Sequence, residues 1–149
     1  MEALIYLDVC CLNRPFDDQT QERIFLEAEA VRIILAHCQS GEWQLLTSQV
    51  IDVELRRTPD SARKEQIKFW TECATTKITI TQQIESRGLQ LSQLGFKNYD
   101  ALHIACAEAG NANIFLTTDD RMLRLAARSK NLLQVRVENP LQWVMEVTS

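Results

Sequence analysis

Two spacings of hydrophobic residues alternate along this chain. Short runs rich in apolar and β-branched residues are typical of strands, and they occupy residues 4–8, 43–47, 77–81, 114–116 and 133–137. Between these runs, apolar residues recur at helical spacing, as on one face of a helix. This spacing predicts helices over residues 20–41, 48–58, 61–75, 84–94, 99–109 and 121–127, and a last helix from residue 140. Alternating strands and helices are typical of an α/β domain with a mainly parallel sheet.

Polar and special residues mark where these elements begin and end. Ser48, Asn98 and Asn139 are suited to cap the amino termini of helices. Gly95 and Gly110 follow helical patterns and predict where two helices end. Proline and Asx residues punctuate residues 9–18, which predicts a loop directly after the first strand.

The composition is that of an ordinary globular domain. The 149 residues are 46% hydrophobic and 24% charged, and four glycines and three prolines are too few for an all-β sandwich. This length fits a single domain over residues 1–149. No apolar run reaches the roughly 18 residues of a membrane span, and the amino terminus lacks a signal-peptide pattern. We therefore expect a cytoplasmic protein.

Cysteine usage and net charge narrow the possible functions. The five cysteines form no C-x-x-C pair, and two histidines are too few for zinc-type spacing. We expect free, mostly buried thiols. The formal net charge of −4 argues against a protein that coats nucleic acid by bulk attraction, although local basic contacts are compatible with it.

Four acidic residues lie where the predicted elements favour chemistry. Asp8 ends the first strand, Asp119 follows the fourth, and Asp100 lies in the first turn of an apolar helix. In a parallel sheet, the strand ends and the helix starts that follow them share one edge, and ligands bind there. We expect these three carboxylates to converge at that edge, with Glu54 reaching in from its own helix.

Each acid also has an ordinary structural explanation. An Asp after a strand often caps the next helix, which applies to Asp119 and to its neighbour Asp120. Asp100 favours the dipole of its helix, and Glu54 fits a solvated position on a helix surface. Asp8 has no such explanation if a loop follows it.

Carboxylates gathered at one edge require a compensating charge. A pair 4 Å apart repels by roughly 4 kcal/mol at an effective dielectric constant of about 20, and a bound cation relieves this repulsion. Carboxylate sites without histidine or cysteine suit Mg²⁺ or Mn²⁺ rather than zinc. Such ions lower the pKa of an attacking water and neutralise a phosphodiester, so phosphodiester hydrolysis is the predicted chemistry.

Four motifs occur in a recognisable order. They are Leu-Asp at 7–8, Val-Glu-Leu at 53–55, Tyr-Asp-Ala-Leu-His-Ile-Ala at 99–105, and Leu-Thr-Thr-Asp at 116–119. This order resembles that of the PIN-domain nucleases, and most of all the small VapC-type toxins of type II toxin–antitoxin systems. The resemblance implies a PIN-like three-layer α/β/α sandwich with a mainly parallel central sheet.

The resemblance also implies a site and its partners. It places Mg²⁺ or Mn²⁺ on Asp8, Asp100 and Asp119, with Glu54 assisting, and makes Thr117 a supporting residue beside these ligands. Asp119 and Asp120 are both candidates for the last ligand, and the T-x-D spacing favours Asp119. The implied activity is an endoribonuclease acting on RNA, regulated by a cognate antitoxin protein, in a homodimer.

Some positions depart from this pattern or lack a role. Cys10 stands where family members often carry a small polar residue, and the task of the following Asn-Arg segment is open. Basic residues for RNA binding would have to be local, and we consider Arg14, Arg121 and the arginines at 56, 57, 124 and 128. Two alternatives stay open: a degenerate, non-catalytic PIN-like binding module, and another Mg²⁺-dependent phosphoesterase.

Overall fold

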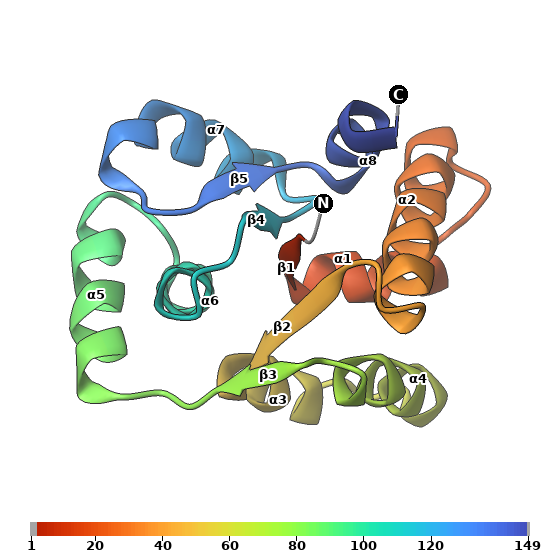
Figure 1. The fold of residues 1–149 in the computed structure, drawn as a ribbon, viewed down its shortest axis with the longest axis horizontal. Coiled ribbons are helices and arrows are strands. Elements are labelled where there is room, and N and C mark those ends of the chain that lie inside the picture. Colours follow the sequence, from red (N-terminus) through yellow and green to blue (C-terminus); the bar gives the residue numbers. More distant parts are fainter. Residues whose placement is uncertain (1–2, 149) are drawn as a thin grey trace.

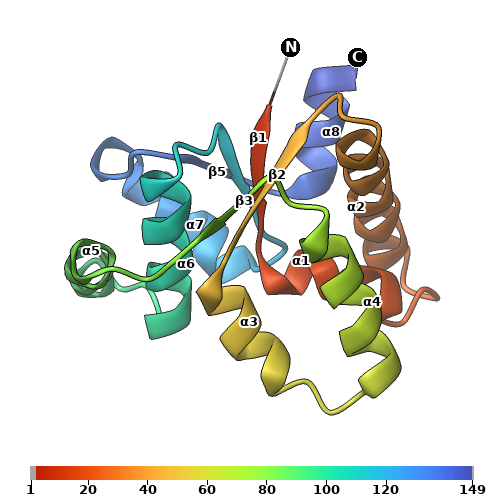
Figure 2. The same ribbon diagram turned by 60° about the horizontal axis from the view of Figure 1, so that its bottom comes forward.

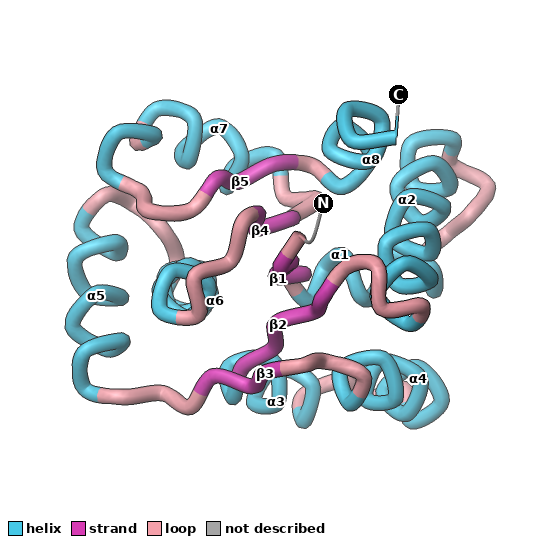
Figure 3. Tube along the Cα trace, viewed as in Figure 1, coloured by secondary structure: helices cyan, strands magenta, loops and turns pink. Residues whose placement is uncertain are grey.

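A parallel sheet forms the centre of the molecule. The computed structural model describes residues 3–148, and within this range five strands pair in the order β3-β2-β1-β4-β5 (Figures 1 and 3). Every neighbouring pair is parallel, which confirms the predicted α/β class. The strands are β1 (Leu4–Leu7), β2 (Gln44–Ser48), β3 (Thr76–Ile78), β4 (Ile114–Leu116) and β5 (Arg136–Glu138).

Helices cover both faces of this sheet. They are α1 (Val9–Asn13), α2 (Glu22–Gln39), α3 (Gln49–Arg56), α4 (Ser61–Glu72), α5 (Gln82–Gln93), α6 (Asn98–Ala109), α7 (Asp120–Arg128) and α8 (Pro140–Thr148), with short 3₁₀ segments η1 (Arg14–Phe16) and η2 (Lys130–Leu132). Figures 1 and 2 show α2, α4 and α8 on one face and α5, α6 and α7 on the other. The predicted three-layer α/β/α arrangement is therefore confirmed.

The central strand explains why its sequence is apolar without interruption. Ile5, Tyr6 and Leu7 are each at most 1% exposed, because β1 pairs with β2 and β4 and helices cover both its faces. Helix α6 packs against the sheet in the same way. Its apolar residues Ala101, Ile104 and Cys106 are buried, as the small apolar pattern predicted.

The prediction of a loop over residues 9–18 is wrong. Residues 9–13 form α1, followed by η1, and Val9, Cys11 and Leu12 bury their side chains. The side chain of Asp8 caps α1 by accepting from the Val9 amide. A five-residue helix is too short to show a helical period in sequence, and the proline fits a 3₁₀ turn as well as a loop.

Smaller differences concern where elements begin and end. The predicted strands at 77–81 and 133–137 are observed as β3 and β5, each shifted and three residues long. Asn98 is the first residue of α6 rather than its cap. Asn139 caps α8 as predicted, accepting from the amides of Leu141 and Gln142.

Two glycines end helices for different reasons. Gly95 follows α5 with a φ of +113°, a conformation that side chains disfavour. Gly110 follows α6, and a glycine is needed there because a Cβ would lie 2.5 Å from Leu46 Cδ2. In the described part of the chain, no helix is both long enough and apolar enough to cross a membrane.

Candidate metal centre

Asp8 and Thr117 lie side by side at the carboxyl edge of the sheet. Leu7 and Leu116 are register partners in β1 and β4, so the next residue of each strand reaches the same edge. The Thr117 hydroxyl donates to Asp8 Oδ2 over 2.9 Å, and the Val9 amide donates to Asp8 Oδ1 over 2.8 Å. Both oxygens of this carboxylate, which is 6% exposed, are thus fixed in place.

Cys10 completes the surroundings of Asp8. Its thiol lies 3.4 Å from Asp8 Oδ2 and 3.2 Å from the Thr117 hydroxyl, and the Thr118 amide donates to its sulfur over 3.3 Å. A thiol is a weak donor and a weak acceptor. Cys10 therefore occupies the place expected for a small polar residue and makes the contacts that such a residue would make.

Glu54 reaches the same edge from α3 and contacts His103 of α6. His103 Nε2 is hydrogen-bonded to Glu54 Oε1 and lies 3.8 Å from Asp8 Oδ1. One ligand atom from each of Asp8, Glu54 and His103 lies within 4.8 Å of the others. The predicted approach of Glu54 to Asp8 is thus observed, together with a histidine that the prediction did not include.

His103 had a signal in the sequence that the prediction left unused. It stands three residues after Asp100 on one helix, and residues at that spacing share a face. Burial opposes protonation of its ring, but the hydrogen bond with Glu54 and the charge of Asp8 outweigh burial, so its pKa lies above the ordinary value. The neighbouring acids thus favour the protonated form of the His103 ring.

Asp100 lies in the first turn of α6 and is electrostatically coupled to the other acids. Burial and then the negative charges of Asp8, Asp119 and Glu54 together raise its pKa to about 6, against the opposing effect of His103. Within the described residues, the compact group around Asp8 does not extend to the carboxylates of Asp100 and Asp119. These acids therefore share a region and its charge rather than one set of mutual contacts.

Asp119 and Asp120 have different partners. Asp119 Oδ1 caps α7 by accepting from the amides of Arg121 and Met122, and the Asp119 amide donates to the Thr117 hydroxyl over 3.2 Å. Both oxygens of Asp120 accept from Arg23, at 2.8 and 2.6 Å, and this ion pair lowers the Asp120 pKa. Thr117 thus connects Asp8 with Asp119, whereas Asp120 is held by an arginine of α2.

Of the two arginines predicted to bind substrate, Arg14 is the more enclosed. Its guanidinium contacts Glu27, which is 1% exposed, at 2.7 Å and Asp17 at 3.3 Å. Arg121, at the start of α7, donates to the Gly95 carbonyl over 3.2 Å. Asn13, directly before Arg14, donates to the Val9 carbonyl and accepts from Arg63. The Asn-Arg segment therefore helps to hold α1, α2 and α4 together.

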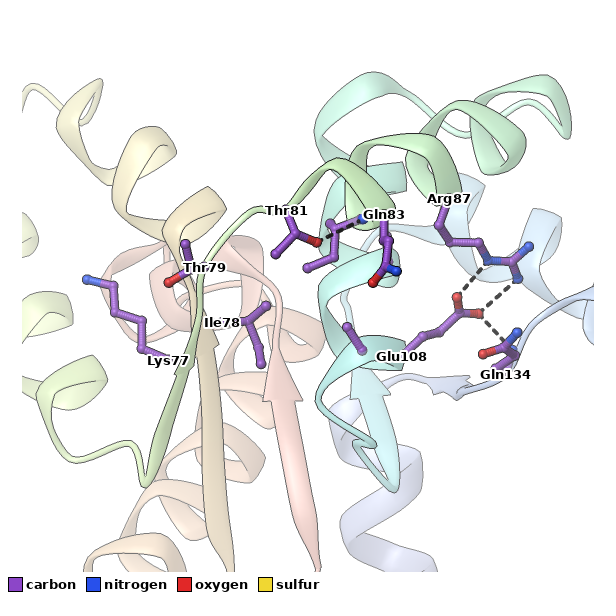
Figure 4. A pocket seen from close by; sticks show the side chains of 11 residues that line it. Lys77, Ile78, Thr79, Thr81, Gln83, Arg87, Glu108 and Gln134 are labelled. Atoms are coloured by element: carbon purple, nitrogen blue, oxygen red, sulfur yellow. Dashed lines mark hydrogen bonds and ion pairs between the residues drawn. The ribbon is translucent and has the colours of Figure 1, made fainter.

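A separate cleft lies between β3 and helices α5 and α6 (Figure 4). Its volume is about 500 Å³, and its lining includes none of the four predicted acids. Arg87 and Glu108 form an ion pair at 2.7 Å in its wall, and the Gln134 amide also donates to Glu108. These contacts tie α5, α6 and the segment before β5 together.

Comparison with known families identifies the fold. A family model described as "PIN domain" matches residues 5–128. The chain belongs to the PIN domain family. The resemblance expected from the four motifs is thereby confirmed. Comparison with curated proteins gives no match.

Solved structures of low identity share this PIN fold. FitAcB from Neisseria gonorrhoeae aligns with a TM-score of 0.57 and 18% identity, over 91% of this chain and 97% of that one. VapBC2 from Rickettsia felis, bound to a DNA fragment from its promoter, gives 0.55 and 13%, over 91% and 98%. VapBC-1 from nontypeable Haemophilus influenzae gives 0.57 and 13%, over 92% and 98%. Two of these three structures carry the VapBC name.

Proposed function

We propose that this PIN domain is a Mg²⁺- or Mn²⁺-dependent endoribonuclease that hydrolyses RNA phosphodiester bonds. The observation that carries the proposal is the group of Asp8, Glu54 and His103, whose ligand atoms lie within 4.8 Å of one another at the carboxyl edge of a PIN-family sheet. The raised pKa of Asp100, caused by burial and then by the charges of Asp8 and Asp119, supports the same location.

The donor atoms at this edge fit a divalent ion. Asp8, Asp100 and Asp119 would hold the ion with Glu54 assisting, and the Thr117 hydroxyl would keep the Asp8 carboxylate in place. A bound divalent ion supplies the charge that makes water a better nucleophile and neutralises a phosphodiester. The Arg23 ion pair of Asp120 supports Asp119 as the ligand of the two.

RNA would reach the site through local basic residues, because the formal net charge is −4. Arg121 follows Asp119 closely and would bind a phosphate beside the metal. Arg14 would contact RNA only by sharing its guanidinium between a phosphate and its partners Glu27 and Asp17. Arg121 is therefore the stronger of the two assignments.

We further propose that the protein acts as the toxin of a toxin–antitoxin pair and forms a homodimer. The support is the resemblance to VapC-type toxins and the fold shared with the VapBC structures. Light scattering of the purified chain, alone and after co-expression with the product of a small neighbouring gene, would measure both associations. A monomer that forms no complex would contradict this part.

The nuclease proposal is tested with purified protein and pooled RNA, with Mg²⁺, with Mn²⁺ and with EDTA. We expect cleavage with either ion and none with EDTA. Asp8→Asn and Asp100→Asn should abolish cleavage while remaining folded, because asparagine caps α1 about as well as Asp8 does, and Asp100 lies within the first turn of α6 rather than at its cap. Asp60→Asn, which replaces the cap of α4, is the matched control and should cleave like the wild type.

The outcomes separate the alternatives. Cleavage that persists in EDTA, or equal cleavage by the wild type and both variants, would overturn the assignment. Mn²⁺ binding without cleavage would indicate the non-catalytic module. Hydrolysis of a simple phosphate monoester without RNA cleavage would indicate another phosphoesterase. Comparing Asp119→Asn with Asp120→Asn identifies which of these two acids is needed.

A further inference from the structure

A buried chain of hydrogen bonds leads to Glu54 from behind the site. Tyr6 of β1, Ser48 at the end of β2 and His103 of α6 are each fully buried. The Tyr6 hydroxyl lies 2.7 Å from Ser48 Oγ and 2.6 Å from His103 Nδ1. The other ring nitrogen, Nε2, contacts Glu54 Oε1. Two strands and one helix thus contribute to a chain of hydrogen bonds that reaches Glu54 through His103.

Every donor and acceptor in this chain of hydrogen bonds is satisfied if each group donates to the next one, from Ser48 toward Glu54. Ser48 Oγ accepts from the Ile51 amide over 3.4 Å, which leaves its proton for the Tyr6 oxygen. Tyr6 can then donate to Nδ1 of His103, and Nε2–H to Glu54. Every polar group has a partner, as buried groups require. The chain begins at the first turn of α3 and ends on Glu54 of that same helix.

Packing holds the middle of the chain rigid. The Tyr6 ring stacks on Phe115 of β4 with a centroid distance of 5.2 Å and an angle of 10°. It meets the His103 ring edge-on at 5.7 Å. Glu54, by contrast, is 25% exposed on its side chain and has a flexible stem. Its direction therefore depends on the hydrogen bond that His103 supplies.

We propose that Tyr6 and His103 are positioning residues that hold the Glu54 carboxylate toward Asp8. The Glu54 side chain is then already in one rotamer when the site binds its metal. This inference rests on the proposed metal site. Groups that orient a metal ligand typically contribute about 10- to 100-fold in metal affinity or activity. Tyr6→Phe removes only the hydroxyl and keeps the stacked ring, which makes it the cleanest perturbation of the chain.

The test is a double-mutant cycle between Tyr6 and Glu54, with Mn²⁺ affinity as the readout. Calorimetric titration of the full chain at one pH gives the Mn²⁺ dissociation constant of the wild type, Tyr6→Phe, Glu54→Gln and the double variant. We expect Tyr6→Phe to weaken binding about 10-fold when Glu54 is present. In the Glu54→Gln background the same change should have almost no effect. Tyr99→Phe, the other tyrosine, is the matched control and should bind Mn²⁺ like the wild type.

His103 is tested by two replacements that differ in one donor. Glutamine keeps an N–H that can reach Glu54, whereas leucine keeps bulk without a donor. We expect His103→Gln to bind Mn²⁺ more tightly than His103→Leu, and these variants carry the test if Tyr6→Phe does not fold. Equal binding by the two would count against orientation by the donor. A loss for His103→Leu that persists fully in the Glu54→Gln background would overturn positioning and indicate that His103 itself binds the metal.

Catalysis gives a second readout that a merely structural role would not move. In Tyr6→Phe we expect a lower kcat with an unchanged KM for RNA, because the substrate contacts stay intact. Equal Mn²⁺ effects of Tyr6→Phe with and without Glu54 would overturn the proposal. The Mn²⁺ titrations use no RNA. A protein that binds Mn²⁺ with this coupling but cleaves nothing would contradict the nuclease assignment and leave the positioning role standing.

Discussion

Asp100→Asn should stabilise the metal-free protein at neutral pH. Burial and the charges of Asp8 and Asp119 raise the pKa of Asp100 from its ordinary 3.8 to about 6. A rise of this size corresponds to about 3 kcal/mol against the ionised form. Partial exposure reduces this energy, and the helix dipole favours the charge by about 0.3–1 kcal/mol. We therefore expect a net gain of about 1–2 kcal/mol from asparagine.

The gain has a defined pH window. Below about pH 3.8 the carboxyl is neutral in both the folded and the unfolded chain and costs nothing. Between that pH and about 6, the unfolded chain ionises while the folded protein keeps its proton, so the wild type loses stability as the pH rises. Above about 6 the loss is complete. The asparagine variant escapes it, and its advantage should be full at pH 8 and small near pH 4.

Urea and thermal unfolding in EDTA at pH 4 and pH 8 measure this difference. For a chain of this size the expected gain raises Tm by roughly 3–6 °C at pH 8. Adding Mn²⁺ should reverse the order, because the wild type gains more from the bound ion. Asp60→Asn should be nearly neutral at both pH values, since asparagine also caps helices. A less stable Asp100→Asn at pH 8, or an equal difference at both pH values, would refute the reasoning.

Two further substitutions test the frame around the site. Glu27→Ala should cost about 1.5–3 kcal/mol in urea unfolding, because Glu27 is 1% exposed and accepts from Arg14 and Arg23, which then keep only Asp17 and Asp120 as partners. An unfolding midpoint close to that of the wild type would show that this network is solvated in solution. Gly110→Ala should cost about 1–2 kcal/mol, because its Cβ would lie 2.5 Å from Leu46 Cδ2 and 3.2 Å from Ile78 Cδ1. A stabilised Gly110→Ala would mean that Leu46 repacks freely.

The different partners of Asp119 and Asp120 show how local and tertiary information combine. The T-x-D spacing favours Asp119, and the Thr117 hydroxyl does connect Asp119 with Asp8. Asp120 forms an ion pair with Arg23, which lies 97 residues earlier on α2. No local pattern links these two residues. Sequence reasoning could therefore favour one acid but could not say what holds the other.

Residues 9–18 show the opposite case, in which a local feature, the short helix α1, was too short to be recognised in the sequence. Asp8 caps α1 by accepting from the next amide, so it has the ordinary explanation that the loop prediction denied it. A capping aspartate leaves one oxygen for other partners, and Asp8 Oδ2 faces Thr117 and Cys10. Capping and metal binding are thus compatible in one residue, and the first does not argue against the second.

The amino-acid sequence was enough to predict the alternation of strands and helices, the parallel sheet and the edge at which Asp8 and Asp119 lie. These follow from periodicity and from which residue ends each strand, both of which are written locally. The contact of Glu54 with His103 and that of His103 with Tyr6, across separations of 49 and 97 residues, became visible only in the folded protein. Such pairs depend on how α3, α6 and β1 pack together. Periodicity tells which face of an element is buried, but packing decides which side chain it meets there.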